Sequence, residues 1–420
     1  MKPQPKKILL AMSGGVDSSV AAYLLKKQGY EIVGAFMKNW GNTKNDFGEC
    51  AWRGERRYAL KIAAMLEIPL ITLDFEKEYK KYVVEKMFKL YKQGITPNPD
   101  IDCNEKIKFP LLIKAAKKLN CDCIATGHYS RIKKLKARVG ERFRGGIGKD
   151  LEAGSRVGRR DGSGTKYLFE LHRAKDESKD QSYFLYRLKQ KELAKALFPI
   201  GNFSKQEIRE IAKKQNFPNY DKKSTVGICF IGKINLKKFL QKKIKPKKGI
   251  ILDPDGNKIG EHDGIYYYTI GQRIGPRFGI EVEKQEIIQK RWYVAKKDNK
   301  KNIITAAPEG HDLNFRKEIF VKDAHWINNN NNNNNFSPSS IKTKSISSEA
   351  RLSGGWVGGK EIKVLSRIRQ VGELLPSKIK FENKNIKVTL NKAITGVSEG
   401  QAIVLYQETK CIGGGVISFH

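Results

Sequence analysis

The chain has 420 residues, 39% of them hydrophobic, and carries 81 lysines and arginines against 44 aspartates and glutamates, a formal net charge of +37. This length and apolar content predict two or three folded domains and exclude a disordered chain. No apolar run approaches the roughly 20 residues that span a bilayer, and the N-terminal MKPQPKK shows no signal-peptide or presequence pattern, so we expect a cytoplasmic protein without membrane association. The positive charge favours nucleic acid as a partner, or else reflects only lysine-rich surface runs.

Strand and helix signals alternate along the first 130 residues. Short apolar runs typical of buried strands occur at 8–12, 31–37, 69–75 and 121–128. Between them, apolar residues at helical spacing predict helices within 19–29, 59–67, 78–94 and 109–120. This alternation predicts a doubly wound parallel α/β sheet.

Composition divides the rest of the chain. Residues 133–166 are rich in glycine, arginine and lysine and predict a loop insertion, either without a function or as an RNA-contacting arm. Ser204 and Glu207 stand in capping-box spacing and predict the start of a further helix. Strand signals alone follow from about residue 315, apart from a run of eight asparagines at 328–335 that we interpret as a surface-loop expansion. We predict three domains: an α/β domain at 1–235, a small central domain at 236–312 and an antiparallel β-barrel at 313–420.

The string SGGVDSS at residues 13–19 follows the first predicted strand and precedes the first predicted helix. The free backbone N–H groups of such a turn, together with the helix dipole, can bind phosphate. The string lacks the lysine of the GxxxxGK[ST] loop and carries Asp17 instead. A carboxylate suits this position if the phosphates arrive with Mg²⁺, which it can bind. We therefore predict a nucleotide-phosphate site with Asp17 as a magnesium ligand.

The six cysteines show no CxxC pair, which argues against a zinc ribbon or a disulfide scaffold. Cys103 ends a polar string that contains prolines, and a helix is predicted to begin near Glu105. The helix dipole and the nearby Lys106 and Lys108 would favour its thiolate, which suits a nucleophile or a sulfur acceptor. Cys229 lies in a short apolar segment and, by itself, is typical of a packing residue. The others match no site motif and are interpreted as structural: Cys50, Cys121, Cys123 and Cys411.

A set of longer strings occurs in order along nearly the whole chain: MSGGVDSSVAAYLL, FMKNW, TPNPDIDCNEKIKF, ATGHYSR, KDQSYFLY, STVGICFIG, GQRIG, WYV and GGGVIS. Together they resemble the motifs of the tRNA-specific 2-thiouridylase family (MnmA type), N-type ATP pyrophosphatases of the PP-loop superfamily. The resemblance implies an adenine nucleotide alpha hydrolase-like fold for the N-terminal domain and ATP with Mg²⁺ as cofactors. It also implies tRNA and a sulfur-carrier or persulfide-donor protein as partners, and we expect a monomer.

The reaction that the resemblance implies is sulfur transfer to C2 of the wobble uridine in tRNAs for lysine, glutamate and glutamine. The uridine O2 would attack the α-phosphate of ATP, giving an adenylylated base and diphosphate. Cys229 would receive sulfur as a persulfide, and Cys103 would assist its release onto C2, ending in a Cys103–Cys229 disulfide that a reductant must reopen. The residues by themselves leave open which of the two cysteines carries the persulfide.

The site residues of the family carry over onto matching positions of this chain. For ATP they are Ala11, Met12, Ser13, Gly14, Gly15, Val16, Asp17, Ser18, Met37 and Gly127. For the target base they are Asn98, Pro99 and Asp100, and for the rest of the tRNA they are Lys179, Asp180, Gln181, Arg367 and Ile368. Three features depart from the family pattern: Ile368 stands where an aromatic residue is usual, the insertion at 133–166 is longer than expected, and the asparagine run at 328–335 is foreign to the family.

Two alternatives stay open beside this reading. Some related tRNA thiolation enzymes use an iron–sulfur cluster held by three cysteines, and Cys103 and Cys229 could supply two of the ligands. The chain could also be a non-catalytic, basic RNA-binding protein that retains the ATP loop as a relic. Activity of metal-free protein would exclude the cluster, and loss of thiolation on replacing Asp17 would exclude the relic.

Overall fold

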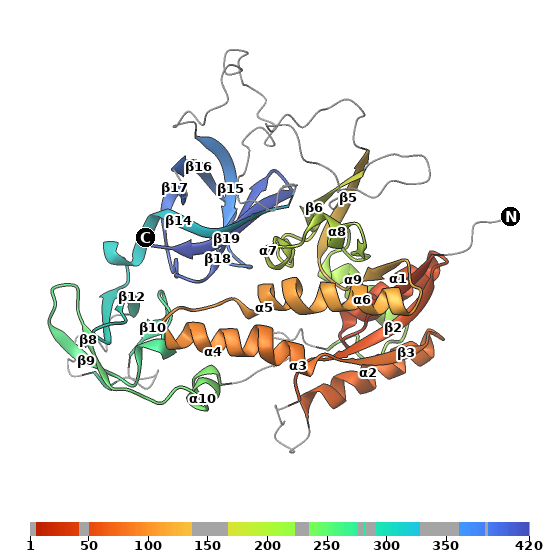
Figure 1. The fold of residues 1–420 in the computed structure, drawn as a ribbon, viewed down its shortest axis with the longest axis horizontal. Coiled ribbons are helices and arrows are strands. Elements are labelled where there is room, and N and C mark those ends of the chain that lie inside the picture. The colour runs from red at the N-terminus through yellow and green to blue at the C-terminus, as the bar shows by residue number, and fades with distance from the viewer. Residues whose placement is uncertain are drawn as a thin grey trace, which may run out of the picture.

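The computed structural model describes residues 6–41, 50–136, 167–222, 235–275, 281–282, 291–327, 361–382 and 385–419, and these form three sheets with associated helices (Figure 1). Cys229, the asparagine run and most of the insertion lie outside these described residues. None of the helices in the described parts of the chain has the length and apolar character needed to cross a membrane.

The first sheet is parallel, as the alternating strand and helix signals predict. Its strands stand in the order β3 (Leu70–Asp74), β2 (Glu31–Lys38), β1 (Lys7–Ala11), β4 (Cys123–Ala125) and β7 (Ala196–Leu197). The chain runs outward from β1 to β3 and then returns to the other side of β1 at β4. This reversal marks the place where a parallel sheet of this kind binds ligands, beyond the carboxyl ends of its central strands.

Helices cover both faces of this sheet (Figure 1). One face packs against apolar side chains of α1 (Val16–Lys27), α2 (Ala51–Met65) and α9 (Lys205–Lys214). The other face packs against α4 (Glu85–Lys92) and α6 (Phe109–Lys118). Ser204 and Glu207 form the predicted capping box at the start of α9, with both reciprocal bonds present. The doubly wound arrangement is thereby confirmed.

Two further helical stretches belong to this domain. The helix predicted within 78–94 is confirmed and consists of α3 (Glu76–Tyr79), a π-helical stretch (Lys80–Val84) and α4. The helix predicted to begin near Glu105 begins instead at Pro99, as α5 (Pro99–Asp102), and continues through a π-helical stretch (Cys103–Lys108) into α6. Proline at a first helical position needs no N–H donor, and the Asn98 side chain caps the helix by accepting from the backbone N–H of Ile101 at 3.4 Å.

The predicted insertion is flanked by an antiparallel hairpin. Its strands are β5 (Ser130–Lys136) and β6 (Tyr167–Arg173). Residues 133–136, which the composition assigned to the insertion, are therefore the end of a strand. The correction arises because this lysine-rich strand end is stabilised by pairing with β6, which is distant in sequence, rather than by a local signal. Short helices α7 (Ser182–Leu185) and α8 (Gln190–Leu193) follow the hairpin.

The second sheet belongs to the middle of the chain, after the short helix α10 (Leu236–Gln241). Its strand order is β10 (Arg273–Ile274), β12 (Trp292–Asp298), β13 (Ile303–Pro308), β8 (Gly249–Leu252), β9 (Lys258–His262) and β11 (Glu281–Val282). All neighbouring strands are antiparallel except β13 and β8, which pair in parallel. This sheet forms the small central domain.

The third sheet closes into the predicted antiparallel barrel. Its strands follow the order β14 (Phe315–Trp326), β17 (Asn385–Thr395), β16 (Leu375–Glu382), β15 (Ile362–Arg367), β18 (Ala402–Gln407) and β19 (Lys410–Ser418), and β14 pairs with β19 to complete the ring. The strand β19 also pairs with β6 of the hairpin, where Lys410 lies opposite His172. The barrel is thereby joined edge to edge with the α/β domain (Figure 1).

Candidate functional site

The glycine loop lies beyond the carboxyl end of β1, at the edge where the strand order reverses. It passes from Ala11, the last residue of β1, to Val16, the first residue of α1, with Gly15 as the N-cap. Gly14 has φ +78°, and a Cβ at this position would lie 2.1 Å from the carbonyl oxygen of Glu55. Only glycine therefore fits here without a shift of the loop. The predicted helix start and the predicted phosphate turn are both present.

The loop is held in shape by hydroxyl and amide side chains. The Ser18 hydroxyl donates to the carbonyl of Gly15 at 3.0 Å and accepts from the backbone N–H of Ser13 at 3.2 Å. Asn219, fully buried, donates from its amide to the carbonyl of Gly14 and to the Ser19 hydroxyl, each at 3.0 Å. The first N–H groups of α1 have no partner within the helix, so they are available to an anion.

Gly127 and Met37 lie at the same edge of the sheet, on the neighbouring strands. Gly127 follows β4 and packs on the first turn of α1, because a Cβ there would lie 2.8 Å from the backbone nitrogen of Ser18. Met37 is near the end of β2 and is buried among the side chains that pack against α4 and α6. The structure thus brings Gly127 into contact with the predicted phosphate loop, whereas the Met37 side chain belongs to the core beneath the sheet.

Asp17 lies in the first turn of α1 and is engaged by two side chains from elsewhere in the chain. The Tyr129 hydroxyl donates to Asp17 Oδ1 at 2.7 Å, and Lys205 Nζ lies 2.6 Å from the same oxygen. Burial and the charge of Asp17 raise the pKa of Tyr129, so its hydroxyl keeps its proton and acts as a donor. Tyr129 and Lys205 were not among the predicted site residues. Tyr129 lies within the string ATGHYSR, and Lys205 directly follows the capping-box residue Ser204.

Cys103 is fully buried, in the same apolar cluster as Met37. It lies one turn inside the helix that begins at Pro99 rather than just before a helix. Of the two lysines expected to favour its thiolate, Lys106 forms an ion pair with Glu105 at 2.8 Å, while Lys108 Nζ lies 3.2 Å from His128 Nε2. The predicted environment of Cys103 is thus corrected: it is an interior thiol.

His128 connects the loop to the helix that carries Cys103. It follows Gly127 directly, contacts Lys108, and its Nδ1 lies 2.7 Å from the Thr126 hydroxyl. Burial, with the charge of Lys108 as a second cause, lowers the pKa of His128 well below its ordinary value, so the ring is neutral. Asn98, Pro99 and Asp100, predicted to contact the target base, are half-buried at the start of the same helix.

The described chain approaches the loop once more just before the segment that contains Cys229. Asn219 holds Gly14, and Lys222 pairs with Glu55 at 2.6 Å. Cys229 itself lies outside the described residues. Its predicted pairing with Cys103 therefore stays a prediction.

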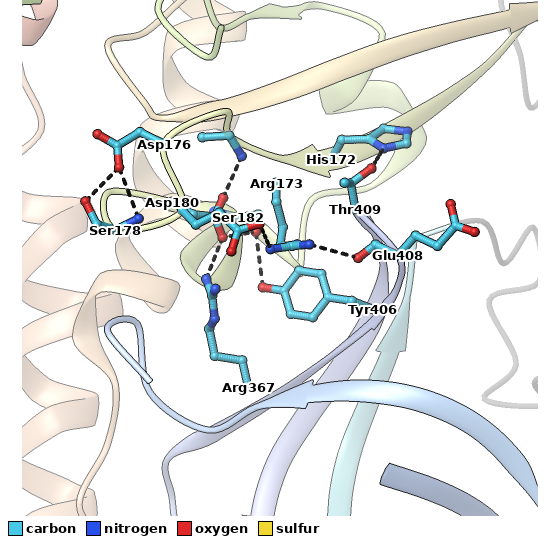
Figure 2. Close-up of polar contacts among 12 residues, drawn as sticks. His172, Arg173, Asp176, Ser178, Asp180, Ser182, Arg367, Tyr406, Glu408 and Thr409 are labelled. Atoms are coloured by element: carbon cyan, nitrogen blue, oxygen red, sulfur yellow. Dashed lines mark hydrogen bonds and ion pairs between the residues drawn. The ribbon is translucent and has the colours of Figure 1, made fainter. Parts of the chain in front are cut away.

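Two of the residues predicted to contact the rest of the tRNA, Asp180 and Arg367, meet between the α/β domain and the barrel, as Figure 2 shows. Asp180 accepts from the backbone N–H of Ala174 at 2.9 Å, from the Ser182 hydroxyl at 2.7 Å and from Arg367 Nη1 at 2.6 Å. The Ser182 hydroxyl lies 3.1 Å from that of Tyr406 on β18. The side chains of Asp180, Ser182, Arg367 and Tyr406 form a buried network, which we call the Asp180 network.

The exposure of the predicted tRNA contacts differs from residue to residue. Lys179 is exposed, and Gln181 is half-buried, with its side-chain oxygen accepting from the backbone N–H of Tyr129 at 2.9 Å. Asp180 and Arg367 are buried and pair with each other, and Ile368 is buried in the barrel core. RNA contact through these positions stays a prediction, and among these five residues only Lys179 is exposed.

The fold and the loop together define a nucleotide-binding α/β domain joined to two β domains. Family models match all three parts: the tRNA methyl transferase HUP domain at residues 6–233, the tRNA methyl transferase PRC-barrel domain at 237–308 and the aminomethyltransferase beta-barrel domain at 316–417. The HUP-domain match agrees with a parallel sheet whose loop is suited to ATP.

Similar proteins extend over the whole chain. Three of them carry the name tRNA-specific 2-thiouridylase MnmA. The protein from Flavobacterium johnsoniae is 33% identical over 98% of this chain and 100% of its own length. Those from Buchnera aphidicola and Francisella tularensis subsp. novicida are 39% and 36% identical over 98% of this chain and 96% and 99% of theirs. The chain therefore belongs to the tRNA-specific 2-thiouridylase family, a family of sulfurtransferase enzymes, and the predicted resemblance is confirmed.

Proposed function

We propose that this enzyme uses ATP to convert the wobble uridine of tRNAs for lysine, glutamate and glutamine into 2-thiouridine. The observation that carries the proposal is the meeting of two functional segments at one edge of the sheet. Gly127 packs on the phosphate loop, and the next residue, His128, contacts Lys108 on the helix that contains Cys103. The predicted phosphate loop and the helix that carries Cys103 thus both contact the segment that follows β4, which supports a shared site.

In the first step, the loop from Ala11 to Ser18 binds the ATP phosphates through its backbone N–H groups. The uridine O2 attacks the α-phosphate, the bond from the α-phosphorus to the bridging oxygen breaks, and diphosphate leaves with the electron pair. AMP is then attached to O2 and makes that oxygen a good leaving group. Both described donors to the Asp17 carboxylate bind the same oxygen, Oδ1. The carboxylate is therefore suited to bind Mg²⁺ as well, and the ion would neutralise the charge of the ATP phosphates.

In the second step, Cys229 carries a persulfide received from a donor protein. The Cys103 thiolate attacks Cys229 Sγ, so the Cys103–Cys229 disulfide forms and the terminal sulfur leaves as hydrosulfide. The hydrosulfide adds to C2, and AMP departs with its oxygen, which leaves 2-thiouridine. A reductant must then reopen the disulfide. Burial of Cys103 keeps this exchange away from bulk water.

Recognition of the tRNA would combine long-range attraction with local contacts. The net charge of +37 attracts the polyanion, and affinity should fall steeply as salt rises. The target uridine must leave the anticodon stack to reach the site, and Asn98 to Asp100 lie at the start of the helix that carries Cys103. Lys179, which is exposed, is suited to a phosphate contact.

The test is mass spectrometry of tRNA nucleosides after incubation of the full chain with ATP, Mg²⁺, unmodified tRNA and a persulfide donor. We expect 2-thiouridine with the wild-type protein and none with Cys103→Ser, Cys229→Ser or Asp17→Ala. Absence of 2-thiouridine from a wild-type sample in which Cys229 is shown to be persulfidated would overturn the proposal. Activity of rigorously metal-chelated protein resupplied with Mg²⁺ alone would exclude an iron–sulfur cluster, for which the described residues offer no group of three ligands.

A further inference from the structure

Lys205 supplies the phosphate loop with a positive charge that the loop itself does not contain. The ammonium group reaches from α9 and lies 2.6 Å from Asp17 Oδ1. The side chain is only 12% exposed, although it ends at a site predicted to bind a highly charged ligand. The same ammonium lies 5.8 Å from the centre of the Tyr129 ring, so an aromatic face supports it as well.

The backbone of Lys205 is fixed by its surroundings. Its N–H donates to Asp176 Oδ2 at 2.9 Å. It is also the first residue of α9, whose start is held by the capping box of Ser204 and Glu207. Because α9 packs directly against α1, the origin of the Lys205 side chain is fixed relative to the loop. Only the end of the side chain has freedom to adjust to a ligand.

The geometry points to a role beyond balancing the charge of Asp17. An ammonium group has three N–H donors, and Asp17 occupies one of them. The remaining donors lie beside the first turn of α1, where the free backbone N–H groups receive phosphate. Asp17 then positions the cation instead of opposing the ligand, which explains how an acidic residue is tolerated in an anion-binding loop.

We propose that Lys205 is a catalytic residue that binds the β,γ-diphosphate portion of ATP and takes the place of the lysine found in GxxxxGK[ST] loops. This inference rests on the proposed use of ATP. Negative charge accumulates on the diphosphate as its bond to the α-phosphorus breaks. A fixed cation at that position therefore stabilises the transition state more than bound ATP, and it lowers the barrier to adenylylation.

The experiment compares Lys205→Met with the wild-type full chain by calorimetric titration with two probes, inorganic diphosphate and AMP, both with Mg²⁺. We expect the diphosphate affinity to fall about 10- to 100-fold, as for loss of one charge-assisted hydrogen bond, and the AMP affinity to stay within about twofold. The rate constant for diphosphate release from ATP in the presence of tRNA should fall about 100-fold. Lys205→Arg should recover part of both losses, since it keeps the charge.

Lys213→Met is the matched control, because it removes the same charge from the exposed far end of the same helix. It should change neither affinity. Unchanged diphosphate affinity in Lys205→Met would overturn the proposal. So would an equal loss for diphosphate and AMP together with a lower melting temperature, since that pattern means a purely structural role. A wild-type protein that binds diphosphate through Lys205 but makes no 2-thiouridine would instead overturn the proposed function alone.

Discussion

Replacement of Arg367 by methionine tests the buried ion pair that joins the barrel to the α/β domain. Arg367 Nη1 lies 2.6 Å from Asp180 Oδ2, and the two side chains are 4% and 0% exposed. Methionine keeps an apolar stem but removes the guanidinium, whose carbon lies 5.8 Å from the centre of the Tyr406 ring, and leaves the Asp180 carboxylate buried without its cation. Breaking a buried pair in this way costs about 3–5 kcal/mol. We expect the free energy of unfolding to fall by that amount, measured by urea denaturation of the full chain.

The double variant Asp180→Asn, Arg367→Met provides the control. The asparagine oxygen can still accept from the Ala174 N–H, and its amide nitrogen, in the place of Oδ2, can donate to the Ser182 hydroxyl. Neither charge is then buried alone. The double variant should therefore be more stable than Arg367→Met, with a coupling energy well above the roughly 0.5 kcal/mol scatter of independent sites. A cost below about 1 kcal/mol for Arg367→Met, or strict additivity of the two changes, would refute the reasoning.

The same variant separates a structural role of Arg367 from a contact with tRNA. If Arg367 neutralises a phosphate, its loss reduces the slope of log affinity against log salt by about 1. If it acts only within the Asp180 network, the slope is unchanged and any loss of affinity is the same at every salt concentration. Filter binding of tRNA across a salt series measures this slope.

Three further predictions concern the loop and the junction with the barrel. Gly14→Ala should lower ATP affinity more than tenfold, since a Cβ would lie 2.1 Å from the Glu55 carbonyl oxygen. Gly29→Ala, at φ +80° in open space, should lower only the free energy of unfolding, by about 1–2 kcal/mol. Equal ATP affinities of the two variants would contradict this. Asn219→Ala should raise KM for ATP and lower the free energy of unfolding by about 1–3 kcal/mol, because the buried carbonyl of Gly14 loses its donor. An unchanged KM would show that the amide does not hold the loop. The His172 hydrogen bond, assisted by Lys410, lowers the pKa of Glu170 from 4.5 to about 2. The ionised Glu170 side chain therefore contributes stability above pH 4.5, and this contribution is lost as the pH falls toward 2. Glu170→Gln should lack this part of the acid transition in urea midpoints measured across that pH range.

The fold was largely predictable because its signals are local and repeated. Buried strands alternating with amphipathic helices predict a parallel sheet, and a long stretch of strand signals predicts the barrel. The errors occur where two rules compete for one residue. The rule that proline breaks helices placed the helix start near Glu105, but a proline at the first helical position begins a helix, and α5 begins at Pro99.

The site was predictable only in the part that is contiguous in sequence. The string from Ser13 to Ser18 predicts a phosphate loop because the turn, the glycines and the helix start are neighbours. Its partners Tyr129, Lys205 and Asn219 are separated from the residues they contact by 112, 188 and 205 positions. Their approach depends on the packing of β4 and α9 beside α1, and no local pattern encodes it.

The position of Cys103 changes the physical account of its reactivity. The sequence favoured a thiolate stabilised by a helix dipole, but that effect falls off within the first turn, and the Cys103 N–H is already bonded to the carbonyls of Pro99 and Asp100. Lys106 is engaged by Glu105. The remaining cation on this stretch, Lys108, lies against a neutral His128 next to the phosphate loop. Lys108 and His128 lie between the two segments, so the proposed function predicts that ATP bound at the loop changes the surroundings of the helix that carries Cys103. Sulfur release would then be coupled to adenylylation through these two residues, and a thiol buried until that stage would be protected from oxidation in the free enzyme.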